Sequence, residues 1–262
     1  MEGSLVLRGV WLSYPRGRRH VVRVLVDVSL EVRPGEVVAV LAQRAQGKTS
    51  LLRVAAGMER PDRGSVLFAG RDMWRDGEDA RRRRHHRRRR RRRGVCSSSV
   101  PIALVRASHP GVDVPVEEGI ALALTGSHRG REARELAARA LEDVGASECA
   151  QRHWDDLGDG ERARVAIAQG ISRDPKVLLV DDLTSTLALD EAEDVAILLH
   201  SLAAERGLGV LVGVGDAQAT RWSDRVATLA GGALIMEPPP PSQTPDYPNI
   251  IDFPGDRNAT AG

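Results

Sequence analysis

The stretch Ala42-Gln43-Arg44-Ala45-Gln46-Gly47-Lys48-Thr49 decides the fold of this chain. It follows the apolar run Glu36–Leu41, which is rich in β-branched residues and typical of a buried strand. From Lys48 to Ala56 the apolar side chains recur at the spacing that predicts a helix. A strand, a tight turn and a helix start gather backbone N–H groups and the positive end of a helix around one point. The pattern therefore predicts a phosphate-binding loop.

Within this loop, Lys48 and Thr49 carry the chemistry. We expect the Lys48 ammonium group to reach the outer phosphates of a nucleotide, and the Thr49 hydroxyl to bind Mg²⁺. Gly47 is retained, but two of the usual glycines are missing, and Ala42 replaces one of them. The loop motif alone fits a structural turn as well as a nucleotide site, and the flanking strand and helix favour the site. The expected nucleotide-binding residues of the loop are Ala42, Gln43, Arg44, Ala45, Gln46, Gly47, Lys48, Thr49 and Ser50.

Two further segments carry acidic residues at informative places. Lys176–Asp182 reads as an apolar strand that ends in the paired carboxylates of Asp181 and Asp182. In a phosphate-loop protein, an Asp at the end of a neighbouring strand supports Mg²⁺, although a strand followed by an Asp-rich turn is also common. Upstream, Leu157-Gly158-Asp159-Gly160-Glu161 opens a predicted helix over Arg162–Gln169. Alone, this is an ordinary helix start with an acidic first turn.

Together these segments resemble the ATP-binding subunit of an ABC transporter, nearest in arrangement to the lipoprotein-releasing and macrolide-export type. The resemblance covers about Ser4 to Met236. It implies an α/β fold with a P-loop NTPase core, in which a mostly parallel sheet is flanked by helices. An antiparallel β subdomain and a helical signature subdomain complete the expected fold. The expected boundaries are an ATP-binding domain over 1–236, its helical subdomain over about 107–172, an Arg-rich disordered insertion over 79–94 and a Pro-rich disordered tail over 237–262.

The resemblance also implies roles for single residues. Tyr14 falls where the family stacks an aromatic ring on adenine. Thr49 and Asp181 fall where it binds Mg²⁺, so ATP and Mg²⁺ are the implied cofactors. The signature, normally Leu-Ser-Gly-Gly-Gln, is occupied by Leu157, Gly158, Asp159, Gly160 and Glu161.

Several departures from the family pattern concern hydrolysis. Asp182 stands where a Glu polarises the attacking water, and Gly215 replaces the switch histidine that contacts the γ-phosphate. Arg106 aligns with the Gln that couples Mg²⁺ and water to the transmembrane partner. Gly158 and Asp159 replace a Ser and a Gly that meet the γ-phosphate of the opposite subunit, and a carboxylate there would repel it. The sequence therefore predicts that Mg-ATP binds but is hydrolysed slowly or not at all.

The resemblance implies a transmembrane permease as partner, and a head-to-tail homodimer or a heterodimer with another ATP-binding subunit. No apolar run approaches the roughly 20 residues that a membrane span needs, and the start lacks the features of a signal peptide. We expect a cytoplasmic protein, peripheral at the inner face of the cell membrane through its partner. Cys96 and Cys149 lack metal-ligand spacing and are expected to be unpaired thiols. A non-catalytic, nucleotide-dependent regulatory subunit is the alternative function.

An arginine tract accounts for the apparent charge balance. Arg81–Arg84 and Arg87–Arg93 supply eleven positive charges, so the formal net charge of +2 would fall to −9 without them. Like charges this dense favour a solvated loop. The tract fits either an insertion without a role or an electrostatic contact of Arg81–Arg93 with anionic lipid or nucleic acid. No aromatic residue interrupts it, so base stacking is not indicated.

Overall fold

The computed structural model describes residues 3–17, 20–74, 101–108, 113–126, 128, 130–216 and 220–237. The arginine tract, Cys96 and the Pro-rich tail beyond Glu237 lie outside the described residues. Their disorder, and the contact with lipid or nucleic acid, therefore stay predictions.

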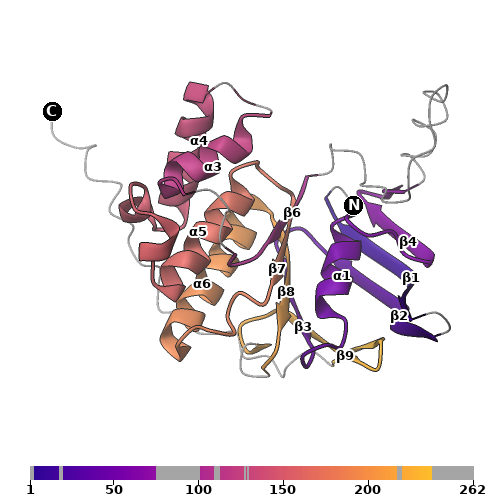
Figure 1. Ribbon diagram of the computed structural model, residues 1–262. Coiled ribbons are helices and arrows are strands. Elements are labelled where there is room, and N and C mark those ends of the chain that lie inside the picture. The colour runs from indigo at the N-terminus through magenta and orange to yellow at the C-terminus, as the bar shows by residue number, and fades with distance from the viewer. Residues whose placement is uncertain are drawn as a thin grey trace, which may run out of the picture.

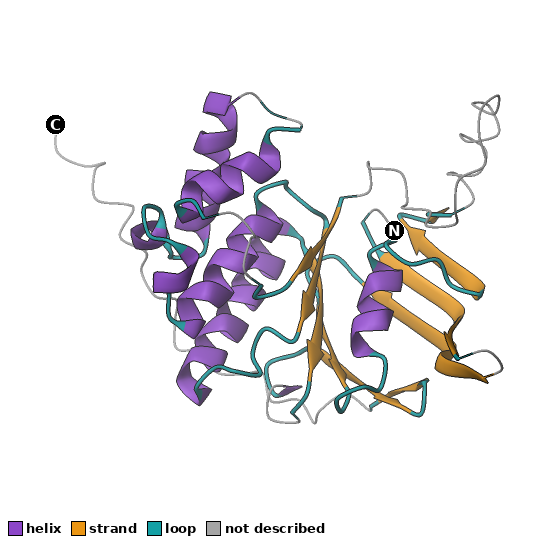
Figure 2. Cartoon of the chain, in the orientation of Figure 1, coloured by secondary structure: helices purple, strands orange, loops and turns teal. Residues whose placement is uncertain are grey.

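The described residues form two sheets (Figures 1 and 2). The first is four-stranded and antiparallel, in the order β2-β1-β4-β5. Its strands are β1 (Leu5–Arg16), β2 (His20–Val32), β4 (Arg63–Phe68) and β5 (Arg71–Asp72). The second, here called the central sheet, is six-stranded in the order β10-β9-β3-β8-β7-β6. Its strands are β3 (Val37–Leu41), β6 (Ile102–Val105), β7 (Val177–Asp181), β8 (Gly209–Val214), β9 (Arg225–Ala230) and β10 (Ala233–Met236).

The helices lie on both faces of the central sheet. They are α1 (Lys48–Ala55), α3 (Val116–Leu124), α4 (Gly130–Asp143), α5 (Asp159–Ile171) and α6 (Leu189–Arg206), with 3₁₀ turns at Ser147–Cys149 and Trp154–Asp156. Helix α1 lies between the central sheet and the antiparallel sheet, whereas α5 and α6 cover the other face (Figure 1). Helices α3 and α4 extend the α5 side into the predicted helical subdomain, whose limits stay predictions.

The central sheet is buried because its strands are apolar on both faces. All residues of β7 and β8 are buried, as expected for parallel strands covered by helices. Alternate side chains enter two cores: Val38, Val40 and Leu211 pack with α1, while Val37, Ala39 and Val210 pack with α5 and α6. This two-sided burial confirms the predicted α/β fold of the phosphate-loop type.

The parallel register brings the functional segments to one edge of the central sheet. Leu41 at the end of β3 is opposite Val214, and Asp181 at the end of β7 is opposite Gly213. Val105, at the end of β6, is opposite Val180. The loops that follow these strands therefore start side by side.

The observed boundaries match the predicted elements closely. The predicted strand over Glu36–Leu41 is β3, and the predicted helix over Lys48–Ala56 is α1. Strand β8 continues to Val214, where it is still paired with β3. None of the described helices combines the length and apolar character that crossing a membrane requires.

Candidate functional site

The phosphate loop joins β3 to α1 through a strained turn. The Ala42 N–H donates to the Val214 carbonyl at 3.1 Å, which ties the loop to β8. Gly47 has φ +100°, and a Cβ there would lie 2.6 Å from Val24 Cγ1, so only glycine fits. Ala45 has φ +65°, a conformation that alanine adopts at a cost. Of the two alanines in the loop, Ala45 is thus strained and Ala42 is not.

Lys48 begins α1 and turns its ammonium group to β7. Its Nζ lies 3.1 Å from Asp182 Oδ1, and its side chain is 11% exposed. The aliphatic part of Lys48 passes over Gly213 of β8, where a Cβ would lie only 2.7 Å from Lys48 Cγ. Gly213 was not among the residues predicted to matter, although a glycine inside an apolar strand often marks a close approach of this kind.

Thr49 and Asp181, the two residues predicted to hold Mg²⁺, are in contact with each other. The Thr49 hydroxyl lies 3.0 Å from Asp181 Oδ2 and 3.2 Å from Oδ1. Both residues supply oxygen atoms of the kind that Mg²⁺ prefers, so they would hold the ion that the resemblance implies. Bound there, Mg²⁺ would offset the charge of the phosphates. No cluster of three or more His, Cys, Asp or Glu side chains in the described part of the chain could hold another metal.

Arg106 also contacts Asp181. It follows β6 directly, and its Nε and Nη2 atoms lie 2.8 and 2.5 Å from Asp181 Oδ2. The sequence placed Arg106 at the position of a glutamine but not against this carboxylate. The Asp181 side chain is thus held by α1 on one side and by the loop after β6 on the other.

The two altered catalytic positions lie next to Lys48. Asp182 has φ +56°, and its carboxylate pairs with Lys48. Among the described residues, a Cβ at Gly215 would have Lys48 Nζ as its nearest neighbour, at 3.9 Å, which is an ordinary contact. Gly215 also lines a hollow with Gln43 and Gln46 of the loop. The edge of the sheet therefore holds the loop, Lys48, Asp181, Asp182 and Gly215 together.

Tyr14 is held at the side of α1. Its hydroxyl donates to Glu59 Oε2 at 2.7 Å and shares a hydrogen bond of 3.1 Å with Ser50. Burial, together with the nearby Glu59 carboxylate, raises the pKa of Tyr14. Glu59, which the sequence did not single out, fixes the tyrosine beside the phosphate-loop helix. Stacking of Tyr14 on adenine stays a prediction.

The signature residues begin α5, across the central sheet from α1 (Figure 1). Glu161 accepts from the Gly158 N–H at 2.8 Å and from Arg152 Nη1 at 2.5 Å. The hydrogen bond from Arg152, aided by the Gly158 N–H, lowers the pKa of the Glu161 carboxyl. Asp159 pairs with Arg162 at 3.2 Å, which offsets part of the negative charge expected to repel a phosphate.

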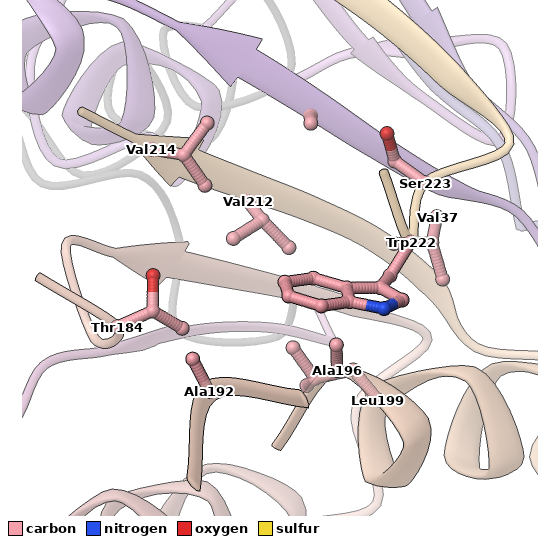
Figure 3. A pocket seen from close by; sticks show the side chains of 10 residues that line it. Val37, Thr184, Ala192, Ala196, Leu199, Val212, Val214, Trp222 and Ser223 are labelled. Carbon is pink, nitrogen blue, oxygen red and sulfur yellow. The ribbon is translucent and has the colours of Figure 1, made fainter. Parts of the chain in front are cut away.

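A separate apolar pocket lies on the α6 side of the central sheet (Figure 3). Val212 and Val214 line it, and the Trp222 ring lies along it. These valines alternate along β8 with Gly213, which faces Lys48, so the pocket is on the opposite face from α1. None of the described residues that line it carries a charge, and Ala192, Ala196 and Leu199 of α6 form one of its walls.

Replacing Ala45 with glycine should stabilise the protein. We expect A45G to raise the free energy of unfolding by about 0.5–1 kcal/mol, because relief of the left-handed strain exceeds the entropy added to the unfolded chain. A42G is the matched control and should destabilise, because Ala42 is buried and not left-handed. Urea unfolding without nucleotide measures both. Equal effects of the two substitutions would contradict the assignment of strain to Ala45.

The Arg152–Glu161 pair should make the start of α5 sensitive to acid. A lowered pKa means that Glu161 stabilises the fold above its ordinary pKa of about 4.3, and that this stabilisation fades as the pH falls through the lowered value. E161Q should therefore lower stability at neutral pH, with a difference from the unsubstituted protein that shrinks in acid. E135Q, which breaks the exposed pair with Arg131, should change little. A constant deficit for E161Q across pH would contradict the account.

Comparisons with known proteins agree with this geometry. The family described as ABC transporter matches residues 25–185, more than half of the chain. The lipoprotein-releasing system ATP-binding protein LolD of Hyphomonas neptunium is 33% identical over 238 residues, which cover 90% of this chain and 98% of LolD. The methionine import ATP-binding protein MetN of Streptomyces avermitilis is 32% identical over 247 residues, which cover 94% of this chain and 67% of MetN.

Solved structures share the fold. A dimeric bacterial ABC transporter cassette, MJ0796, superimposes with a TM-score of 0.70 at 24% identity, over 88% of this chain and 96% of that chain. The protein cbiO1 from Clostridium perfringens, part of the ABC transporter complex cbiONQ, gives a TM-score of 0.71 at 21% identity, over 88% and 86% of the two chains. With the family match and the phosphate loop beside Asp181, these likenesses identify the chain as a member of the ABC transporter family and an ATP-binding subunit.

Proposed function

We propose that this chain binds Mg-ATP at its phosphate loop to drive or regulate a transmembrane permease, and that it hydrolyses ATP slowly or not at all. ATP and Mg²⁺ are the cofactors of ABC cassettes. The proposal rests on one observation: the side chains of Lys48, Thr49, Asp181 and Asp182 lie in contact at one edge of the central sheet. This arrangement supports binding of a phosphate chain more strongly than it supports turnover.

Binding is supported by the charge at the start of α1. Lys48 supplies an ammonium group, and the first N–H groups of the helix add their partial positive charge. Lys48 now pairs with Asp182, whose side chain is 44% exposed. Such an exposed carboxylate is a weak competitor for a multiply charged phosphate, so ATP would take Lys48 from it.

Weak hydrolysis is supported by what faces the phosphate site. A base that activates water needs a free carboxylate within hydrogen-bond reach of that water. The Asp182 side chain is one methylene shorter than the Glu of the family, so its carboxylate would fall short of that reach. Gly215 offers no side chain to contact a γ-phosphate, although the space beside Lys48 Nζ would admit one. Both groups that act on the γ-phosphate in the family are thus altered in this chain.

The assembly is proposed by likeness. A head-to-tail dimer, either homodimer or heterodimer, would bring the signature at Leu157–Glu161 to the phosphate loop of a second subunit. The permease would hold the chain at the cytoplasmic face of the membrane. The chain covers 98% of LolD and 67% of MetN, which favours the lipoprotein-releasing arrangement as its transport class.

A non-catalytic regulatory subunit is the second candidate. The shorter side chain of Asp182 and the glycine at position 215 favour it, because both alter hydrolytic groups while leaving the binding loop in place. In that case ATP would control dimerisation or contact with the permease without a turnover cycle. Binding and turnover measured on one sample separate the two candidates.

Lys48 should dominate nucleotide affinity. We expect K48A to weaken ATP binding by about 10- to 100-fold, since a hydrogen bond to a charged group contributes about 1.5–3 kcal/mol. Isothermal titration with a non-hydrolysable ATP analogue measures the loss. Lys176 is the only other lysine of the chain and pairs with Asp174 before β7, so K176A is a matched control that should bind normally. Equal losses in K48A and K176A would contradict the proposed site.

Restoring the two altered catalytic side chains should restore turnover. We expect the double variant D182E with G215H to hydrolyse ATP at least about 10-fold faster, because a positioned base contributes on the order of 100-fold or more. Steady-state phosphate release measures the change. Adding K48A to the double variant should abolish the gain. If the original chain already turned over at a normal rate that K48A abolished, the proposal of weak hydrolysis would be wrong.

A further inference from the structure

Arg106 is placed against Asp181 by the register of two strands. Val105, the last residue of β6, is opposite Val180 of β7, so the residues that follow them are neighbours. The guanidinium group donates twice to one oxygen, Asp181 Oδ2, at 2.8 Å from Nε and 2.5 Å from Nη2. The backbone positions of the two paired strands therefore place Arg106 beside Asp181 at the edge of the sheet.

The two partners differ in their exposure. The Asp181 side chain is 3% exposed, whereas that of Arg106 is 46% exposed. A buried carboxylate needs a charged or hydrogen-bonding partner, and here Arg106 and Thr49 provide it. Because nearly half of the Arg106 side chain remains exposed, the guanidinium group keeps donors that Asp181 does not use.

The charge of the site follows from these pairs. Lys48 is paired with Asp182, and Arg106 is paired with Asp181, so these four groups have a formal sum of zero. With a neutral side chain at position 106, the same groups would sum to −1. A divalent cation is attracted by that negative charge and by a free Asp181 oxygen. Arg106 removes the charge and covers Oδ2.

We propose that Arg106 is a built-in cation that competes with Mg²⁺ for Asp181 and itself offsets part of the phosphate charge. Mg²⁺ can still accompany the bound ATP, but the affinity for ATP then depends little on a divalent cation. This inference rests on the proposed binding of ATP at the Lys48 loop. It concerns the charge that accompanies the nucleotide, and it holds whether or not the chain hydrolyses ATP.

The test is equilibrium binding of a non-hydrolysable ATP analogue to the full chain, in excess Mg²⁺ and in excess EDTA. For the unsubstituted protein, we expect the two dissociation constants to agree within about threefold, because Arg106 stays in place under both conditions. In R106Q, EDTA should weaken binding at least about tenfold, the effect expected when a unit charge beside a partly buried carboxylate is lost. R106K should behave like the unsubstituted protein because it keeps the positive charge.

R131Q is the matched control, because Arg131 lies on the exposed face of α4 and pairs only with Glu135 in the described contacts. It should leave the ratio of the two dissociation constants unchanged. If R106Q did not fold, the ratios of the two dissociation constants for the unsubstituted protein and for R106K would still test the inference. Strong dependence on Mg²⁺ in the unsubstituted protein would overturn the inference and leave ATP binding intact. Absence of binding in both buffers would overturn the proposed function as well.

Discussion

The buried carboxylate of Asp181 is the constraint on which the site depends. It is the single buried acidic or basic side chain in the described part of the chain. A charge removed from water must be paired or hydrogen-bonded, and Asp181 meets this need through Thr49 on α1 and Arg106 after β6. Three segments far apart in the sequence are thereby fixed to one another. The position of the phosphate loop relative to β7 follows from this contact together with the parallel register of the central sheet.

The same edge of the sheet underlies the proposed separation of ATP binding from hydrolysis. Phosphate binding uses the helix start, Lys48 and the backbone of the loop, all of which are in place. Hydrolysis needs a well-placed base and a contact to the γ-phosphate. Asp182 is one methylene shorter than the Glu of the family, and Gly215 has no side chain. The signature is less altered electrostatically than its sequence indicates, since Arg162 offsets part of the charge of Asp159. The proposed loss of turnover would thus be a local change at two positions of the fold.

Most of the fold could be predicted because its signals are local. The β-branched runs of β3, β7 and β8 and the helical spacing in α1, α4 and α6 are visible in short windows of sequence. The order of the motifs then indicated the family, and the family pattern predicted that Lys48, Thr49 and Asp181 share one site. What could not be predicted depends on contacts between distant residues. The strain at Ala45, the close approach of Lys48 to Gly213, the bond from Tyr14 to Glu59 and the pairing of Arg106 with Asp181 all need the folded backbone.

The chemical state of bound nucleotide tests the central claim most directly. Protein in excess over radiolabelled ATP, sampled over time, reports whether the nucleotide held at Lys48 is recovered as ATP or as ADP. Bound nucleotide should be recovered as ATP long after binding is complete, and K48A should retain much less nucleotide than the unsubstituted protein. Recovery as ADP and phosphate as fast as the complex forms would contradict the account.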